Sequence, residues 1–478
     1  MNSIPDAWPT PGLQATIAAS QPFFNGKQVL VTGACGFVGG YLVRALHATG
    51  AQVTALDKDT SPERGALLNL TGLRDELQVI EADVTQRTVA QEVISSGNYD
   101  FIFHFAVETP NQDLRQPYDV IRAYTLSFIH VAEAVRQLPL DSRPVILLAS
   151  SDKVDGGIDV ERLPVPRREA DWPWADLGID QSTQRAAELF ATTYHRTLGV
   201  PTIVLRLCNL FGSYDFNDNG HLIPKALRNI FRDGEAPDLY INATEHYRDY
   251  LYVEDGVRAF MHLAQREACR GHIYNLPGAR YAATPDVLRD LIDLIILLQS
   301  EDKENNPNSP FANLRWNRTV RIVKSDPRPA IAHKPRTDGT RLETEADFEP
   351  SVTFRNALRH TIHYYYWYFT QIAPNPSQPK INHALESNVP TPAPPATLTI
   401  PVSPDTIEEQ QPIETVPPLI PTANSLYQVL RPKQQATEAP PEVEEDADPA
   451  TEDVPHAPNP RPAYVTVYKL EKPDEPRA

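Results

Sequence analysis

The glycine-rich loop near the N-terminus constrains the fold more than any other stretch of the chain. The run Lys27–Thr32 is short and rich in β-branched residues, which is typical of a buried strand. Gly33, Gly36 and Gly39 follow it at once, and helical apolar spacing continues over Tyr41–His47. Glycines at this spacing are a weak signal alone, but their position between a strand and a helix predicts a loop that binds a dinucleotide.

Each residue of this loop has its own expected role. Gly33 would let the chain turn tightly, Gly36 would let backbone N–H groups approach a pyrophosphate, and Gly39 would let helix and sheet pack closely. The helix that begins with Phe37 and Val38 would present the positive end of its dipole to the phosphates. The alternative is a glycine turn that holds no ligand.

An acidic residue ends the next predicted strand. Asp57 lies 24 residues after Gly33 and follows the run Gln52–Leu56. A carboxylate at this position can accept hydrogen bonds from both ribose hydroxyls and repel a 2′-phosphate. The sequence therefore predicts NAD rather than NADP as the cofactor.

Strand-like and helix-like runs alternate over the first 210 residues. Further strands are expected at 77–81, 101–105, 145–149 and 202–207. Helices are expected at 127–137 and 186–198. This alternation predicts an α/β fold with a Rossmann-type, doubly wound parallel sheet.

Beyond about residue 210 the pattern loosens into shorter elements. Helices are expected at 225–232, 256–265, 285–298 and 354–364, and the polar, Asn- and Pro-rich stretch 300–309 predicts an inserted loop. We divide the chain into a flexible leader (1–24), an NAD-binding domain (25–210), a smaller substrate-binding subdomain (211–370) and a tail (371–478). Segments of the subdomain can return to the NAD-binding domain.

The composition of the last part of the chain is unlike the rest. Residues 373–478 hold 23 of the 46 prolines, no glycine, and 16 acidic against 7 basic residues. Such a segment cannot bury enough apolar surface to offset the entropy lost on ordering. We expect a disordered C-terminal tail.

Several classes of protein are disfavoured by composition. Cys35, Cys208 and Cys269 form no CxxC pair, which argues against a disulfide framework and a cysteine zinc site and favours a reducing cytoplasm. No acidic or histidine cluster has metal-ligand spacing, so no metal is expected. The most apolar run, near 288–298, is short and interrupted by charge, so no membrane span is expected. A net charge of −18 without a basic stripe disfavours nucleic-acid binding.

Six motifs occur in an order that resembles one known family. They are VTGACGFVG (31–39), EADV (81–84), HFA (104–106), LASSDK (148–153), LRLCNLFG (205–212) and RDYLYVED (248–255). Over about residues 25–370 the chain resembles the extended short-chain dehydrogenase/reductase family of NAD-dependent nucleotide-sugar epimerases and dehydratases. The Ser-Asp-Lys run and LIP (222–224) most resemble the CDP-glucose 4,6-dehydratase group.

The resemblance implies roles for further residues. Asp83 and Val84 would contact the adenine, and Phe105 and Ala106 would line the cofactor groove. On the substrate side, Asn209 and Arg248 would face the diphosphate and nucleotide of a nucleotide-sugar such as a CDP- or dTDP-hexose. A structural alternative stays open for both: Asn209 can cap a turn and Arg248 can pair with a carboxylate. His104 is expected to be a strand-end residue rather than a catalyst.

The pair expected to transfer the proton is missing. The resemblance implies a Tyr-x-x-x-Lys pair on one helix face, where residues four apart are neighbours. Aligning the helix that contains 186–189 places Asp180 at the Tyr position and Gln184 at the Lys position. An Asp near its usual pKa is a much weaker base than a tuned phenolate, and Gln carries no charge. The chain's only Tyr with a Lys four residues later is Tyr468, in the tail.

Other parts of the expected active site are retained. Ser151 matches the residue that hydrogen-bonds the sugar O4, Asp152 matches the dehydratase general acid, and Lys153 matches the CDP-glucose group. Asp152 can also be a turn residue after the strand. Asp155 stands where the family usually has Tyr.

Two apolar islands in the tail share a pattern. LYQVLRP (426–432) and VYKLEKP (467–473), centred on Tyr427 and Tyr468, suit docking to a protein partner, although chance similarity is the alternative. Two functions follow. One is a catalytically impaired NAD-binding scaffold that recruits a partner through its tail, and the other is an active 4,6-dehydratase or epimerase with an atypical proton shuttle. The lost pair and the tail motifs favour the scaffold, and the resemblance implies a homodimer.

Overall fold

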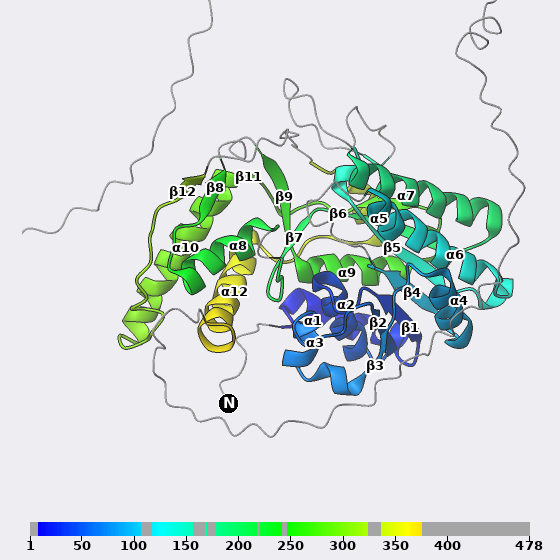
Figure 1. The fold of residues 1–478 in the computed structure, drawn as a ribbon, viewed down its shortest axis with the longest axis horizontal. Coiled ribbons are helices and arrows are strands. Elements are labelled where there is room, and N and C mark those ends of the chain that lie inside the picture. Colours follow the sequence, from blue (N-terminus) through cyan, green and yellow to red (C-terminus); the bar gives the residue numbers. More distant parts are fainter. Residues whose placement is uncertain are drawn as a thin grey trace, which may run out of the picture. The chain divides into compact units, whose positions relative to one another are not determined.

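The computed structural model describes residues 8–106, 117–155, 168–169, 178–217, 220–240, 246–323 and 336–374. All of them belong to the compact unit formed by residues 1–402 (Figure 1). The tail motifs around Tyr427 and Tyr468 and residues 1–7 lie outside the described residues. The predicted division near residue 210 stays a prediction.

A seven-stranded sheet forms the centre of this unit. Its strands are β1 (Gln28–Thr32), β2 (Gln52–Asp57), β3 (Gln78–Glu81), β4 (Phe101–His104), β5 (Val145–Ser151), β6 (Thr202–Leu207) and β10 (Ile273–Asn275). Their order is β10-β6-β5-β4-β1-β2-β3, and every neighbouring pair is parallel. The predicted Rossmann-type parallel sheet is therefore confirmed. The strand order reverses between β1 and β4, and ligands of such sheets bind at this point, outside the carboxyl ends of the strands.

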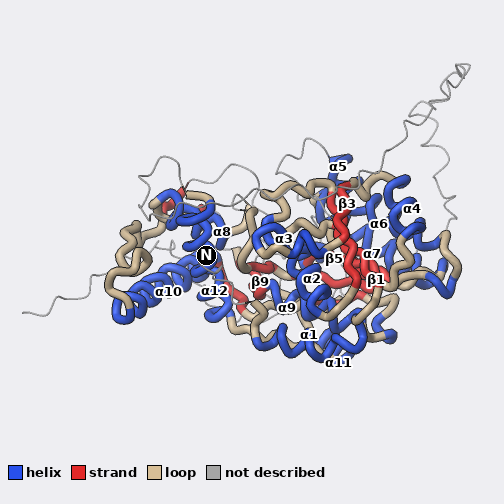
Figure 2. Tube along the Cα trace, turned by 90° about the horizontal axis from the view of Figure 1, so that it is seen from below, coloured by secondary structure: helices blue, strands red, loops and turns tan. Residues whose placement is uncertain are grey.

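Helices cover both faces because side chains on successive strand residues point to opposite faces. Val29 and Val31 of β1 belong to the apolar cluster formed with α2 (Phe37–Ala48) and α9 (Val253–Ala264). Leu30 between them belongs to the cluster formed with α4 (Arg87–Ser96), α6 (Ser127–Arg136) and α7 (Ile179–Leu198). Figure 2 shows α4, α6 and α7 on one side of the strands and α2 on the other. The central strands are consequently buried on both faces.

The N-terminal segment corrects the expectation of a flexible leader. Residues 11–24 form helix α1 (Pro11–Phe24), in which Leu13 and Phe24 are fully buried. The backbone N–H and the hydroxyl of Thr10 donate to the buried Glu254 carboxylate of α9 at 2.8 and 2.6 Å. The prolines at the start of the chain made a helix hard to predict there. Packing against α2 and α9 and the hydrogen bonds of Thr10 stabilise this helix.

The remaining elements are shorter. A three-stranded sheet contains β7 (Asn209–Phe211), β9 (Tyr247–Tyr252) and β11 (Arg280–Ala283), and a two-stranded sheet contains β8 (Asp238–Tyr240) and β12 (Arg321–Val323). The other helices are α3 (Ala66–Leu70), α5 (Pro117–Ile121), α8 (Leu222–Arg228), α10 (Thr284–Asn305), α11 (Thr340–Ala346) and α12 (Phe354–Trp367). Because α10 continues to Asn305, the predicted loop at 300–309 is wrong for its first half. The Gln299 side chain donates to the carbonyl oxygens of Phe311 and Leu314 and so holds this helical end against the following turn.

Candidate active site

The glycine loop lies at the switch point of the sheet, and Gly33 and Gly39 leave no room there for a side chain. Gly33 has φ +69°, and a Cβ built on it would lie 2.5 Å from the carbonyl oxygen of Phe105, which follows β4. A Cβ on Gly39 would lie 2.2 Å from the Gly33 carbonyl oxygen. Gly36 is the N-cap of α2 and supplies no side-chain cap. Phe37 and Val38 therefore begin a helix whose first N–H groups are suited to an anion.

Asp57 holds the glycine loop from the neighbouring strand. Its Oδ2 accepts from the Cys35 N–H at 3.0 Å, and its Oδ1 accepts from the Asp59 N–H at 3.3 Å. Burial raises the pKa of Asp57, while the nearby Arg64 guanidinium acts in the opposite direction. Arg64 also lies 3.5 Å from a Cβ built on Gly36. Arg64 was not predicted from the sequence, where its only signal is a basic residue shortly after Asp57.

Replacing Asp57 by Asn is expected to weaken NAD binding roughly ten- to a hundredfold, because the predicted charged acceptor for the ribose hydroxyls is lost. NADP binding should fall less or should rise, since Arg64 remains and the repelling charge is gone. Calorimetric titration with NAD and with NADP measures the two Kd values and so their ratio. Asp59→Asn is the matched control because Asp59 is exposed and accepts from the Ser61 N–H at 3.0 Å in the same loop. An equal loss for both dinucleotides would contradict the role of the Asp57 charge.

The other expected cofactor residues end neighbouring strands at the same edge. Asp83 follows β3 and accepts from the Thr85 N–H at 2.9 Å, and Val84 is buried. Phe105 and Ala106 follow β4, and the Ala106 N–H donates to the Thr32 hydroxyl at 3.2 Å. The loops after β1, β2, β3 and β4 thus form one continuous carboxyl edge. Their contacts with a cofactor stay predictions.

His104 is held in a buried line of hydrogen bonds. Its Nδ1 lies 2.8 Å from the Thr32 hydroxyl of β1, and its Nε2 lies 3.2 Å from the Ser127 hydroxyl of α6. Burial lowers the pKa of His104 to about 4, so the ring is neutral at pH 7. This arrangement fits the expected structural role, because both ring nitrogens are used inside the protein.

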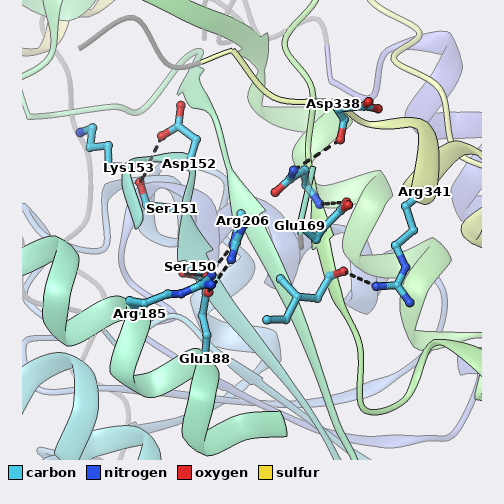
Figure 3. A network of polar contacts seen from close by, with 12 residues as sticks. Ser150, Ser151, Asp152, Lys153, Glu169, Arg185, Glu188, Arg206, Asp338 and Arg341 are labelled. Carbon is cyan, nitrogen blue, oxygen red and sulfur yellow. Dashed lines mark hydrogen bonds and ion pairs between the residues drawn. The ribbon is translucent and has the colours of Figure 1, made fainter. Parts of the chain in front are cut away.

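The retained reactive residues lie at the end of β5 and in the turn that follows (Figure 3). The Ser151 hydroxyl lies 3.2 Å from Asp152 Oδ1, and the Lys153 N–H donates to the same hydroxyl at 3.2 Å. Burial lowers the pKa of Lys153, and the Asp152 and Asp180 carboxylates counteract this effect. The structure therefore brings Ser151, Asp152 and Lys153 close to the first turn of α7, where Asp180 lies.

Asp180 and Gln184 lie one above the other in the first two turns of α7. Burial, followed in part by the charge of Asp180, raises the pKa of the nearby Tyr124 to about 12; this residue was not predicted from the sequence. Tyr124 belongs to the π-helical turn η2 (Arg122–Leu126) between α5 and α6. No sequence motif marks it, because only the packing of η2 against α7 places it beside the substituted positions.

A buried ionic network below this site fixes α7 to the sheet. The Glu188 carboxylate accepts from Arg206 Nε and Nη2 of β6, both at 2.9 Å, and both residues are fully buried. It also accepts from the Ser150 hydroxyl at 2.7 Å and from Arg185 at 2.9 Å (Figure 3). Ser150 precedes Ser151 on β5, so the network sets the position of the reactive turn relative to α7.

The two expected substrate residues lie on the small sheet next to this site. Asn209 of β7 has a buried Nδ2 that makes no hydrogen bond with the described residues. Arg248 of β9 donates to the Tyr247 carbonyl oxygen at 2.8 Å. Burial lowers the pKa of Arg248, and the Asp152 carboxylate counteracts this effect. The charges of Arg248 and Asp152 therefore influence each other, whereas the contacts of Arg248 and Asn209 with a nucleotide-sugar stay predictions.

The fold and this edge of the sheet define a dinucleotide-binding α/β protein. The sequence model of the NAD dependent epimerase/dehydratase family matches residues 29–276. The chain therefore belongs to this family, which confirms the family resemblance and the family's cofactor, NAD.

Similar proteins carry dehydratase and epimerase names. A probable dTDP-glucose 4,6-dehydratase of Sinorhizobium fredii is 28% identical over 346 residues, which cover 71% of this chain and 92% of the relative. The fold resembles dTDP-glucose 4,6-dehydratase from Bacillus anthracis in complex with NAD (TM-score 0.58, 21% identity, covering 71% of this chain and 96% of that one). It also resembles UDP-glucose 4-epimerase of Thermotoga maritima with UDP-glucose (TM-score 0.57, 19% identity, covering 70% and 98%). The finer resemblance to the CDP-glucose group stays a prediction.

Three further features concern the described residues alone. Cys35, Cys208 and Cys269 are buried free thiols. In the described part of the chain, no group of three or more His, Cys, Asp or Glu residues is placed to hold a metal ion. None of the helices seen there is long and apolar enough to cross a membrane.

Proposed function

We propose that this chain binds NAD and a nucleotide-sugar at the carboxyl edge of its sheet but transfers hydride far more slowly than relatives with the Tyr–Lys pair. The observation that carries this proposal is the first part of α7. Asp180 and Gln184 occupy the positions assigned to the pair by the resemblance, in a site that keeps its glycine loop, Ser151 and Lys153.

The residues present fit an NAD molecule. The glycine loop has no side chains where a pyrophosphate would approach, and α2 begins there without a side-chain cap. Asp57 would accept from the adenosine ribose, and the buried Gln184 Oε1, which has no hydrogen-bond partner among the described residues, would accept from a ribose hydroxyl. When bound, NAD supplies the hydride acceptor for the sugar carbinol.

The substrate side retains groups for orientation and acid catalysis. Ser151 would hydrogen-bond the sugar O4, and Asp152 would donate a proton as the general acid. Arg248 would balance charge between Asp152 and a diphosphate, and the Nδ2 of Asn209 would donate to the same ligand. We propose a CDP- or dTDP-hexose as this ligand, and the names of the relatives support the dTDP form.

Purified protein is expected to retain NAD and to convert dTDP-glucose or CDP-glucose at least about a hundredfold more slowly than a dehydratase with the pair, since a positioned proton-transfer group contributes 10²–10⁴-fold. The NAD released on denaturation measures cofactor retention. The sugar products, followed by NMR, measure turnover. Gly33→Val is the control that should lose NAD, because a side chain there meets Phe105. Rapid turnover would contradict the impairment, and protein that neither contains nor takes up NAD would contradict the binding function.

The tail adds a second part to this proposed function. Through its Tyr427 and Tyr468 motifs it would recruit a protein partner, which makes the chain a scaffold rather than a metabolic enzyme. A homodimer and a location in the cytoplasm are also proposed. The alternative is an active NAD-dependent 4,6-dehydratase or epimerase with an atypical proton shuttle, for which rapid turnover and not partner recruitment would be the function.

A further inference from the structure

A guanidinium group from the loop after β2 lies beside the glycine loop. Nη2 of Arg64 is 3.5 Å from the position that a Cβ on Gly36 would take, and Gly36 is the N-cap of α2 without a side-chain cap. The Arg64 side chain is exposed, and the only hydrogen bond of this residue to the described part of the chain is made by its backbone N–H. A cation without a counter-ion among the described residues therefore lies at the start of α2.

The turn that carries Arg64 is built by its own hydrogen bonds and packs on the glycine loop. The Gly65 N–H donates to the Ser61 carbonyl oxygen at 2.8 Å, and the Arg64 N–H donates to the Ser61 hydroxyl at 3.4 Å. A Cβ on Gly65 would lie 3.4 Å from Sγ of Cys35, which belongs to the glycine loop. The backbone of Arg64 is thus held close to Gly36 even though its side chain is exposed.

The beginning of the same loop is fixed to the neighbouring strand. The Thr60 side chain is buried, and its hydroxyl donates to the Glu81 carboxylate at the end of β3. The Thr60 carbonyl oxygen accepts from Arg74 Nη1 at 2.7 Å. The loop is therefore positioned before any ligand binds, which lowers the entropy lost when Arg64 contacts one.

Asp57 does not take up the Arg64 guanidinium. Its two carboxylate oxygens accept from the backbone N–H groups of Cys35 and Asp59, and no ion pair joins it to Arg64. Burial raises the pKa of Asp57, and Arg64 is the first of the charges that oppose this effect, so the two groups are near each other without being bonded. The fork of Arg64 N–H donors stays available for another anion.

We infer that Arg64 binds the pyrophosphate of the bound dinucleotide, together with the N–H groups of Phe37 and Val38 at the start of α2. The inference rests on the proposed function, because it needs NAD in the site. Gly36 is the residue whose missing side chain lets a pyrophosphate approach, so a guanidinium beside it is placed for that group. Its planar fork of donors matches two oxygens of a phosphate, and the α2 dipole attracts the same charge.

Arg64→Ala tests the inference on the full-length protein after its retained NAD has been removed. We expect the Kd for NAD to rise roughly tenfold, because charge-assisted hydrogen bonds to a phosphate are lost. The Kd for NADP should rise by the same factor, since both dinucleotides carry the pyrophosphate. Arg64→Lys should recover part of the loss, because the charge remains while the planar fork is gone. Calorimetric titration measures each Kd.

Two fragments of the cofactor locate the contact. ADP carries two phosphates and adenosine carries none, so Arg64→Ala should raise the Kd for ADP roughly tenfold and leave that for adenosine within about twofold of the wild-type value. Arg289→Ala is the matched control. Arg289 is 61% exposed and pairs with Asp286 of the same helix, α10, at 3.1 Å, so its removal should change neither Kd.

Each other outcome decides against a specific statement. A loss of NADP affinity much larger than the loss of NAD affinity would assign Arg64 to the 2′-phosphate and overturn the inference. Wild-type affinity for NAD in Arg64→Ala, or equal losses for ADP and adenosine, would also overturn it. Wild-type protein that fails to bind NAD would instead overturn the proposed function, whatever the variant does.

Discussion

Replacing Glu188 by Met is expected to lower the free energy of unfolding by about 3–5 kcal/mol, because it removes the Glu188 charge that pairs with the fully buried Arg206 guanidinium. The loss is large because the carboxylate also receives hydrogen bonds from Ser150 and Arg185. Chemical denaturation, monitored by circular dichroism, measures this loss in the free energy of unfolding. The active-site turn should loosen as well, since Ser150 precedes Ser151 on β5.

A double-mutant cycle separates the ion pair from simple packing. Removing both charges with Glu188→Met and Arg206→Met should cost less than Glu188→Met alone, because no unpaired buried charge remains. Glu267→Gln is the matched control: its 2.9 Å pair with Arg270 is exposed and should change stability by less than about 1 kcal/mol. If the double variant is as unstable as the sum of the two single variants, the unpaired charge is not the cause.

Local patterns were sufficient to predict the central sheet. The run at 27–32 and the glycines that follow it predict β1, the loop and α2, since strand, turn and helix are each encoded within a few residues. Alternating strands and helices then allow few topologies, because crossovers between parallel strands are almost always right-handed. The observed order, with its reversal between β1 and β4, is one of the topologies that these constraints allow.

The errors have a common physical cause. Helix α1 is short, and its stability comes from Leu13 and Phe24 packing against the rest of the unit and from the bonds between Thr10 and Glu254. The end of α10 is polar in sequence, yet Gln299 bonds the backbone at Phe311 and Leu314. Neither contact is visible as a local pattern, because the partners come from other segments of the chain.

The residues of the candidate site also fall into those that local motifs predict and those that depend on contacts between distant segments. The glycine loop, Asp57 and the Ser151–Lys153 turn could be found from motifs, because a strand end and a turn place them. Arg64, Tyr124 and the Glu188–Arg206 pair could not, since each depends on the packing of separate elements. Tyr124 in particular carries no spacing signal, because η2 and α7 are more than 50 residues apart in the sequence.

Replacing Asp180 by Tyr and Gln184 by Lys together is expected to raise the rate of sugar oxidation roughly a hundredfold or more, because a phenol beside an ammonium group on one helix face is restored. The change of charge should lower the stability of the protein. Lys153 loses the Asp180 carboxylate and gains a second ammonium group as a neighbour, so the variant should unfold at lower denaturant concentration than the wild type. Rates with dTDP- and CDP-glucose under saturating NAD measure the gain.

The single variants make this rescue specific. Asp180→Tyr or Gln184→Lys alone should raise the rate little, because the phenol pKa falls only when the ammonium lies beside it. No gain with NAD bound would place the defect on the substrate side, at Asn209, Arg248 or Asp152, rather than in α7.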